Sequence, residues 1–193
     1  PKEFRLSLYQ EKGAIIDKKT AGILLAAIIS DTLMFRSPTC TQMDRAAAEA
    51  LAKIAEVDIE ELAKKMFEAG SDFKKKTTEE LFYQDFKTFH TDEFDFGVAQ
   101  LSAMSDVQLG MAKKKLQPYL EIALGEQKLD AVFVMLTDIL DENSEVIYAG
   151  AQAGSLLKEC FGEPDESGSF YLKGVVSRKK QMIPALMAGL QQA

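Results

Sequence analysis

The spacing of hydrophobic and polar residues changes along the chain, and each change marks an expected element. Apolar residues recur at helical spacing over residues 3–10, 18–35, 43–55, 59–69, 78–83, 106–125, 151–161 and 177–190. Partial alternation on both sides of an acidic turn predicts a β-hairpin formed by residues 86–90 and 94–102. A continuous apolar run at residues 131–137 predicts a buried strand, and shorter strands are expected at residues 146–149 and 170–176. Helices before and between short strands predict an α/β fold with a mixed β-sheet flanked by helices.

The helix expected at residues 18–35 is apolar on nearly every side, which is typical of a helix buried on more than one face. Only a short helix precedes it, so we expect that its full cover lies outside this sequence. Pro38 interrupts the helical pattern and predicts a linker at residues 37–42. The expected organisation is therefore the helical end of one domain at residues 1–36, the linker, and a second domain at residues 43–193.

Composition narrows the class of protein. The 193 residues are 47% hydrophobic and 27% charged, with 12 Gly and 5 Pro, which excludes a disordered or collagen-like chain. The longest apolar run, at residues 21–29, is too short for a membrane span. Cys40 and Cys160 are far apart and outside any metal-binding spacing, so we expect reduced thiols in a cytoplasmic protein. Pro1 is not expected to be the natural start, because no initiator methionine precedes it.

The net charge of −7 disfavours nucleic acid and anionic membranes as partners. One basic segment departs from that average: Ser177-Arg178-Lys179-Lys180, at the start of the last expected helix. Cations at a helix N-terminus oppose the helix dipole, whereas the free N–H groups there favour an anion. Arg178 and Lys179 are therefore candidates for binding a phosphate, and the alternative is a solvated basic turn.

Other charged residues give weaker signals. Lys87, on an expected strand, and the triplet at residues 74–76 are further basic candidates, although surface lysines usually have no ligand. Asp31 follows an almost wholly apolar stretch, where a carboxylate either binds a metal or is exposed at the helix end. His90 is the only histidine in the sequence, so the chain cannot form a His-rich metal site or a Ser-His-Asp triad.

Two long motifs resemble one enzyme family. The segment at residues 29–41, ISDTLMFRSPTCT, is similar to the motif that closes the catalytic domain of family II, manganese-dependent inorganic pyrophosphatases, in the DHH phosphoesterase superfamily. The segment at residues 174–181, GVVSRKKQ, is similar to the C-terminal signature of that family. The region between them matches in order and length, so the resemblance covers essentially the whole chain.

The resemblance implies roles for four residues. Asp31 corresponds to a metal ligand, and Arg178 and Lys179 correspond to the basic pair that contacts substrate phosphates. Lys87, in the segment Asp85-Phe86-Lys87, corresponds to a further phosphate-binding lysine. The implied cofactor is Mn²⁺ at a dinuclear site, with Mg²⁺ or Co²⁺ as alternatives, and the implied substrate is pyrophosphate.

The other metal ligands of the family, an early His, an Asp-x-Asp, a further Asp and the DHH motif, do not occur in this chain. The resemblance therefore implies the C-terminal, substrate-gripping part of a pyrophosphatase, inactive by itself, whose parent forms a homodimer through its DHH domain. We assign no catalytic residue within the chain. Two alternatives stay open: an exopolyphosphatase-like DHH phosphoesterase, and a non-catalytic module that binds phosphate or polyphosphate.

Overall fold

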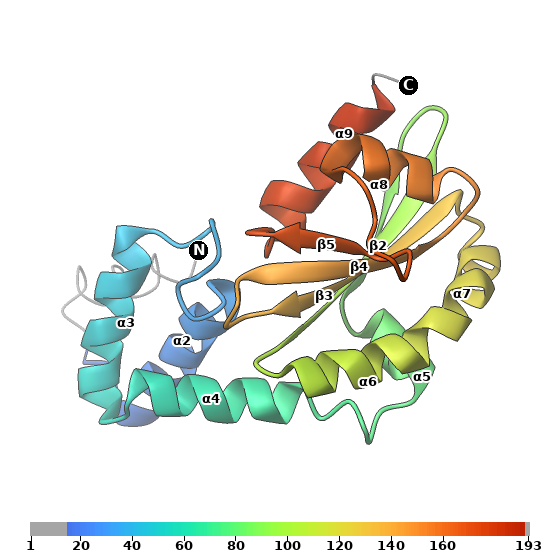
Figure 1. Cartoon of the computed structure of the whole chain (residues 1–193). Helices are drawn as coiled ribbons and strands as arrows, with labels where there is room; N and C mark the ends of the chain where they lie inside the picture. The colour runs from blue at the N-terminus through green and yellow to red at the C-terminus, as the bar shows by residue number, and fades with distance from the viewer. Residues whose placement is uncertain (1–14, 192–193) are drawn as a thin grey trace. The chain divides into compact units, whose positions relative to one another are not determined.

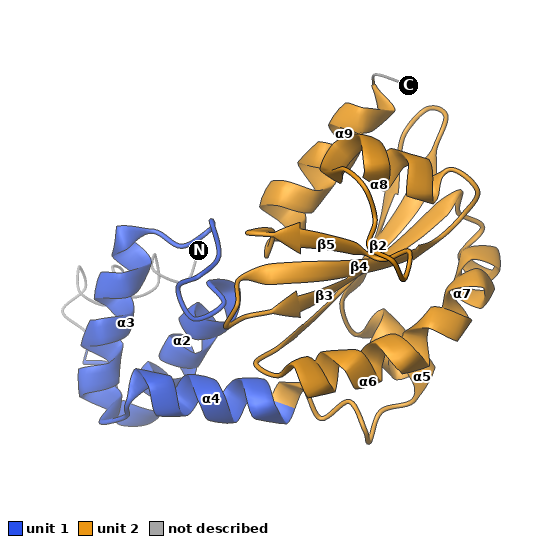
Figure 2. Cartoon of the chain, in the orientation of Figure 1, with its two compact units in different colours: residues 1–69 blue, residues 70–193 orange. Residues whose placement is uncertain are grey.

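The chain forms two compact units, residues 1–69 and residues 70–193 (Figure 2). The structure is a computed structural model that describes residues 15–191. The helix expected at residues 3–10 lies outside the described residues. No helix between residues 15 and 191 is long and apolar enough to cross a membrane.

The first unit is helical. Its helices are α2 (Lys18–Asp31), α3 (Gln42–Ala55) and α4 (Ile59–Gly70), whose last residue begins the second unit. Asp17 caps α2 by accepting a hydrogen bond from the Thr20 N–H, and Thr41 forms a reciprocal capping box with Asp44 at the start of α3. The three helices share one apolar core, made of Ala21, Leu25, Ile28, Ile29, Ala47, Ala48, Leu51, Ala55 and Ala63.

Helix α2 ends at Asp31, four residues before the predicted end, because the next segment turns into the left-handed region. Leu33, Met34 and Phe35 have φ values of 47°, 53° and 67°. Each costs about 1 to 2 kcal/mol relative to a right-handed conformation. The Thr32 hydroxyl stabilises the turn by donating to the Ile28 carbonyl and accepting from the Phe35 N–H, at 2.8 and 3.1 Å.

The second unit is built on a five-stranded sheet in the order β1-β2-β3-β4-β5. The strands are β1 (Phe86–His90), β2 (Asp95–Ala103), β3 (Ala131–Asp138), β4 (Asn143–Ala149) and β5 (Phe170–Lys173). Strands β2 and β3 are parallel, and the other neighbours are antiparallel. Every residue of β3 is buried, as expected for a central strand with both faces covered.

Helices cover both faces of this sheet (Figure 1). One face packs against α5 (Thr78–Phe82), α6 (Asp106–Leu116) and α7 (Leu120–Gln127), with 3₁₀ turns η1 (Tyr83–Asp85) and η2 (Gln117–Tyr119) after α5 and α6. The other face packs against α8 (Ala153–Phe161) and α9 (Ile183–Leu190), the latter preceded by a π-helical turn, η3 (Arg178–Met182). The side chains of Val98, Phe133 and Val146 belong to this second core.

The predicted fold class, a mixed sheet flanked by helices, is confirmed. Three elements differ in detail. The helix expected at residues 106–125 is interrupted by η2, where Pro118 cannot donate a hydrogen bond. Strand β5 ends at Lys173 rather than residue 176, and β4 begins at Asn143, three residues before the predicted start.

The division into compact units falls at residues 69 and 70, whereas the predicted linker lay at residues 37–42. Pro38 does end a helical pattern, but α3 returns to pack against α2 through Ala48 and Leu51. The segment around Pro38 is therefore a turn inside the first unit. The predicted domain at residues 43–193 spans α3, α4 and the whole second unit.

Candidate anion-binding site

The segment after β5 crosses the sheet on the face covered by α8 and α9. Three polar side chains, one each from β4, β3 and β2, take the place of apolar ones along its path: Ser144, Thr137 and Gln100. Ser144 Oγ donates to the Val175 carbonyl at 2.7 Å, and Gln100 Nε2 donates to the Val176 carbonyl at 3.0 Å. Thr137 Oγ1 lies between them, 2.9 Å from Ser144 Oγ and 3.0 Å from Gln100 Nε2. The sheet thereby fixes the path of the main chain up to residue 176.

Two further side chains then turn the chain into η3. Ser177 is the N-cap and accepts a hydrogen bond from the Lys180 N–H. The Gln181 amide accepts from the Val176 and Ser177 N–H groups at 2.9 and 3.0 Å and donates to the Gly174 carbonyl. The predicted capping role of Ser177 is confirmed. The hydrogen bonds of Gln181 also hold the backbone next to Arg178 in place.

Arg178 is buried, with 8% of its surface exposed, and it points to the start of β1 and the middle of β2. Its Nη1 donates to the carbonyls of Asp85 and Val98 at 2.6 and 3.0 Å, and its Nη2 donates to Asp85 Oδ1 at 2.7 Å. The guanidinium therefore joins η3 to β2 and to the last residue of η1, which directly precedes β1.

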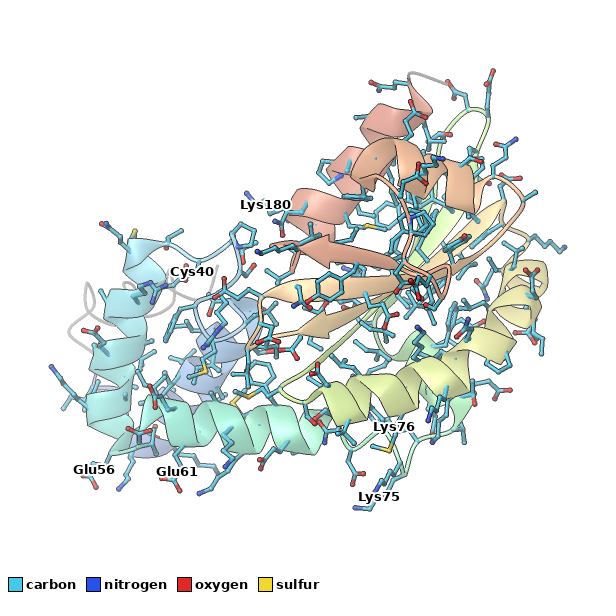
Figure 3. All side chains as sticks on the ribbon, viewed as in Figure 1. Cys40, Glu56, Glu61, Lys75, Lys76 and Lys180 are labelled. Carbon is cyan, nitrogen blue, oxygen red and sulfur yellow. The ribbon has the colours of Figure 1, made fainter. Side chains whose placement is uncertain are left out.

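Lys87 lies two residues after Asp85, and Lys179 directly follows Arg178. Lys87 is exposed on β1, and its partner in the strand register is Val98, whose carbonyl accepts from Arg178. Lys87 shares the α8/α9 face with Phe89, which packs against that core. Lys179 and Lys180 follow Arg178 in η3 and are exposed; Figure 3 shows the Lys180 side chain pointing away from the sheet.

The structure thus brings Arg178 next to the strand pair that carries Lys87, and Lys179 directly follows Arg178 in η3. Among residues 15–191, neither Lys87 nor Lys179 has a carboxylate within salt-bridge distance, whereas Arg178 pairs with Asp85. Lysine ammonium and arginine guanidinium groups are the side chains that suit an anion with several oxygens, so these three residues stay the candidates for such a site.

Asp31 belongs to the first unit. It is the exposed last residue of α2, and its backbone carbonyl accepts from Thr39 Oγ1 at 3.3 Å. Within the described residues, Asp31 is not part of a group of three or more potential metal ligands. Manganese prefers several oxygen and imidazole ligands at once, and among residues 15–191 no such set includes Asp31.

The other basic candidates have local partners. Lys75 pairs with Asp72 at 2.7 Å, and Lys76 donates to the Gln84 amide oxygen, both in the loop that contains the lysine triplet (Figure 3). His90 lies 3.1 Å from Asp95 and is largely exposed at the end of β1. These contacts give the lysine triplet and His90 structural roles at the surface.

Two features of the site did not follow from the sequence. Asp85 was part of the Asp-x-Lys segment but had no assigned role, and its pairing with Arg178 spans 93 positions. Gln100 lies in a strand that is otherwise mostly apolar, which is the one local signal that could have singled it out. Neither contact can be inferred from spacing alone, because both depend on how the segment after β5 crosses the sheet.

Three carboxylates meet away from this site, at the ends of β2 and β3. Oxygens of Asp106, Asp138 and Asp141 lie within 4.8 Å of one another. Asp138 is buried and accepts from the N–H groups of Leu140 and Asp141, so the turn itself explains its position. A hydrogen bond to Asp138 and the charges of Asp138 and Asp141 raise the pKa of Asp106.

An open pocket of about 490 Å³ lies beside the β1–β2 turn and α8. Its lining residues are Thr91, Glu93, Phe94, Gln152, Ser155, Leu156, Glu159 and Leu190. The charged ones are acidic, so this pocket does not suit a phosphate.

Comparison with known proteins gives a consistent result. The family model described as DHHA2 domain matches residues 64–188. The "Probable manganese-dependent inorganic pyrophosphatase" of Bacillus velezensis is 44% identical over 183 residues, which is 93% of this chain and 58% of that protein. The "Manganese-dependent inorganic pyrophosphatase" of Bacillus subtilis is 40% identical over 179 residues, with the same two shares.

A solved structure is also similar. The crystal structure of a Methanococcus jannaschii protein, described as a "putative family II inorganic pyrophosphatase", superposes with a TM-score of 0.81 at 34% identity. The match covers 92% of this chain and 57% of that one. The chain therefore spans somewhat under three fifths of the length of these relatives.

Proposed function

This chain belongs to the DHHA2 domain family, and we propose that its second unit binds pyrophosphate as part of a manganese-dependent inorganic pyrophosphatase. The observation that supports this proposal most directly is that Arg178, which Lys179 follows, binds the carbonyl of Val98, the register partner of Lys87. The relatives are pyrophosphatases by name, and pyrophosphate is an anion with several oxygens.

The two kinds of cation have different tasks in this proposal. Lys87 and Lys179 supply mobile positive charge to the phosphate oxygens, and Arg178 supplies directed hydrogen bonds. During hydrolysis, negative charge increases on the departing phosphate, and fixed cations stabilise that charge without reorganising. The second unit would thus hold the substrate and favour release of one phosphate.

Manganese would supply an activated water as nucleophile in such an enzyme. Within this chain, Asp31 is the proposed ligand, and one exposed carboxylate binds a divalent ion only weakly. A dinuclear centre would therefore need ligands from outside this sequence. We expect the 193-residue chain to bind pyrophosphate without hydrolysing it.

Titration calorimetry with pyrophosphate at low ionic strength tests the binding role. We expect Lys87→Ala and Lys179→Ala each to weaken binding about tenfold, since each removes a charge-assisted contact. Wild-type binding should weaken as salt is added, because exposed charges are screened. Lys114→Ala, a change of an exposed lysine on α6, should leave affinity unchanged.

The result that contradicts the proposal is no detectable binding to the wild-type chain, or equal losses in all three variants. A phosphate-release assay with added Mn²⁺ tests the expected inactivity. Turnover by the chain alone, abolished by Arg178→Met, would show that its own residues complete a catalytic centre. Stronger binding of a longer polyphosphate than of pyrophosphate would favour the exopolyphosphatase alternative.

A further inference from the structure

We propose that Asp85 is a positioning residue, which holds the Arg178 guanidinium so that its unused edge faces the substrate phosphate. This inference rests on the proposed function of the site. It concerns a residue that does not itself contact the substrate, and whose negative charge would by itself repel an anion.

The Arg178 guanidinium has more N–H donors than it has acceptors among the described residues. A guanidinium has five N–H donors, two on each Nη and one on Nε. Asp85 takes two of them, through its carbonyl at 2.6 Å from Nη1 and its carboxylate at 2.7 Å from Nη2. The Val98 carbonyl takes the second Nη1 donor at 3.0 Å. Among the described residues, no acceptor is found for Nε–H or for the second Nη2–H.

Those two remaining donors share one edge of the planar group. Asp85 binds both Nη atoms and so occupies the end of the guanidinium, which leaves the edge formed by Nε and Nη2. Two parallel N–H groups on one edge match two oxygens of a phosphate. The contacts of Asp85 and Val98 therefore determine which edge of the Arg178 guanidinium is available to a ligand.

Burial makes this arrangement rigid. The Arg178 side chain is 9% exposed, whereas the Asp85 side chain is 48% exposed. A buried guanidinium needs a paired charge to remain stable, and Asp85 supplies that charge from the partly solvated side. The pair is formally neutral, so Lys87 and Lys179 provide the net positive charge that attracts the substrate.

The same contacts set the position of Lys87. Asp85 precedes it by two residues, and Val98 is its partner in the β1–β2 register. One guanidinium thereby fixes the start of β1 against β2, where the Lys87 side chain begins. Loss of Asp85 would disturb the direction of Arg178 first and the placement of Lys87 second.

The effect of Asp85→Ala on pyrophosphate affinity has opposite signs for a positioning role and for a role of charge alone. If Asp85 acted only by its charge, Asp85→Ala would strengthen the binding of pyrophosphate. If Asp85 positions Arg178, the same change weakens binding, by about tenfold or more. Asp85→Asn keeps the volume and an amide oxygen for Nη2, so its affinity should stay within about threefold of wild type.

A double-mutant cycle with Arg178→Met shows whether Asp85 acts through Arg178. We expect Asp85→Ala to have no further effect on pyrophosphate affinity in the Arg178→Met background. The salt dependence of binding should become weaker with Lys87→Ala, because that change removes an exposed cation. Asp92→Ala, a change of an exposed carboxylate in the β1–β2 turn, is the matched control and should bind as wild type does.

Each possible result of these experiments either supports or overturns the positioning role of Asp85. Far-UV circular dichroism identifies any variant that fails to fold, and if Asp85→Ala is such a variant, the full affinity of Asp85→Asn together with a loss in Asp85→Leu supports the inference. Wild-type binding that Arg178→Met weakens and Asp85→Ala does not would overturn the inference alone. A wild-type chain that does not bind pyrophosphate would overturn the proposed function and this inference with it.

Discussion

At the scale of single residues, one group of interacting carboxylates lies outside the proposed site and is formed by Asp106, Asp138 and Asp141. The hydrogen bond to Asp138 and the charges of Asp138 and Asp141 raise the pKa of Asp106 above its ordinary value. The folded chain therefore binds a proton at Asp106 more readily than the unfolded chain does. Stability contributed by that proton is lost as pH rises through the raised pKa.

Asp106→Asn removes this dependence on pH. We expect the free energy of unfolding of the variant, relative to wild type, to increase as pH rises above about 4, the ordinary pKa of an aspartate carboxyl. Urea unfolding of both proteins at several pH values measures the difference. Asp92→Asn serves as a control for loss of an exposed carboxylate, and a constant difference between Asp106→Asn and wild type would contradict the prediction.

The residues of the proposed site were partly predictable. The sequence placed Arg178 and Lys179 where cations are unfavourable unless an anion is bound, and the structure supplies one such anion from within the chain, Asp85. Local spacing could not reveal Asp85, because contact between residues 93 positions apart depends on the complete fold of the second unit. The metal role of Asp31 and the phosphate roles of Lys87, Arg178 and Lys179 stay predictions.

At the scale of elements, η3 depends on hydrogen bonds from its own residues to the main chain before it. Gln181 satisfies three backbone groups, the N–H groups of residues 176 and 177 and the carbonyl of Gly174. Buried backbone groups that lose their partners lower stability. The start of this helical segment, and with it Arg178, therefore depends on one amide side chain.

Gln181→Ala should lower the free energy of unfolding by about 1 to 3 kcal/mol, because it leaves these groups without a partner. Urea denaturation gives the value. Gln152→Ala provides the control, since Gln152 at the start of α8 makes no side-chain capping bond and is exposed. Equal stability of the two variants would show that η3 does not need the Gln181 bonds.

The sequence predicted most elements correctly where one periodicity dominated. The β1–β2 hairpin and the buried strand β3 appear as expected, because alternation and a continuous apolar run are local signals. The end of α2 was predicted wrongly. Leu33, Met34 and Phe35 favour a helix by composition, and the hydroxyl of Thr32 and the turn after it override that preference.

At the scale of the whole molecule, the described residues form separate cores in the two units. One core draws only on α2, α3 and α4 with their flanking residues, and the other two lie on opposite faces of the sheet. The boundary between the units lies inside the last turn of α4, which no break in sequence pattern marks. The domain boundary predicted at residues 37–42 falls in the turn between α2 and α3, and it stays a prediction.

Separate cores predict separate responses to mutation. Leu51→Ala, in the first unit, should cost that unit about 2 to 5 kcal/mol and increase hydrogen exchange in α2 and α3. Amide protection in β2 and β3 should stay at the wild-type level. Phe133→Ala should give the reverse pattern, and loss of protection in both units from either variant would contradict the prediction.

The pairing of Arg178 with Asp85 also has a consequence for the order of events as the chain is made. Each strand of the sheet pairs with the strand that precedes it, so the sheet can grow in the order of synthesis. Arg178 is different, because it binds Asp85, which directly precedes β1, and so joins residues 93 positions apart. Closing so long a loop costs conformational entropy, so we expect this contact to form late in folding. The proposed anion site would therefore be complete only at the end of folding, so that a partly synthesised or partly folded chain does not bind the ligand.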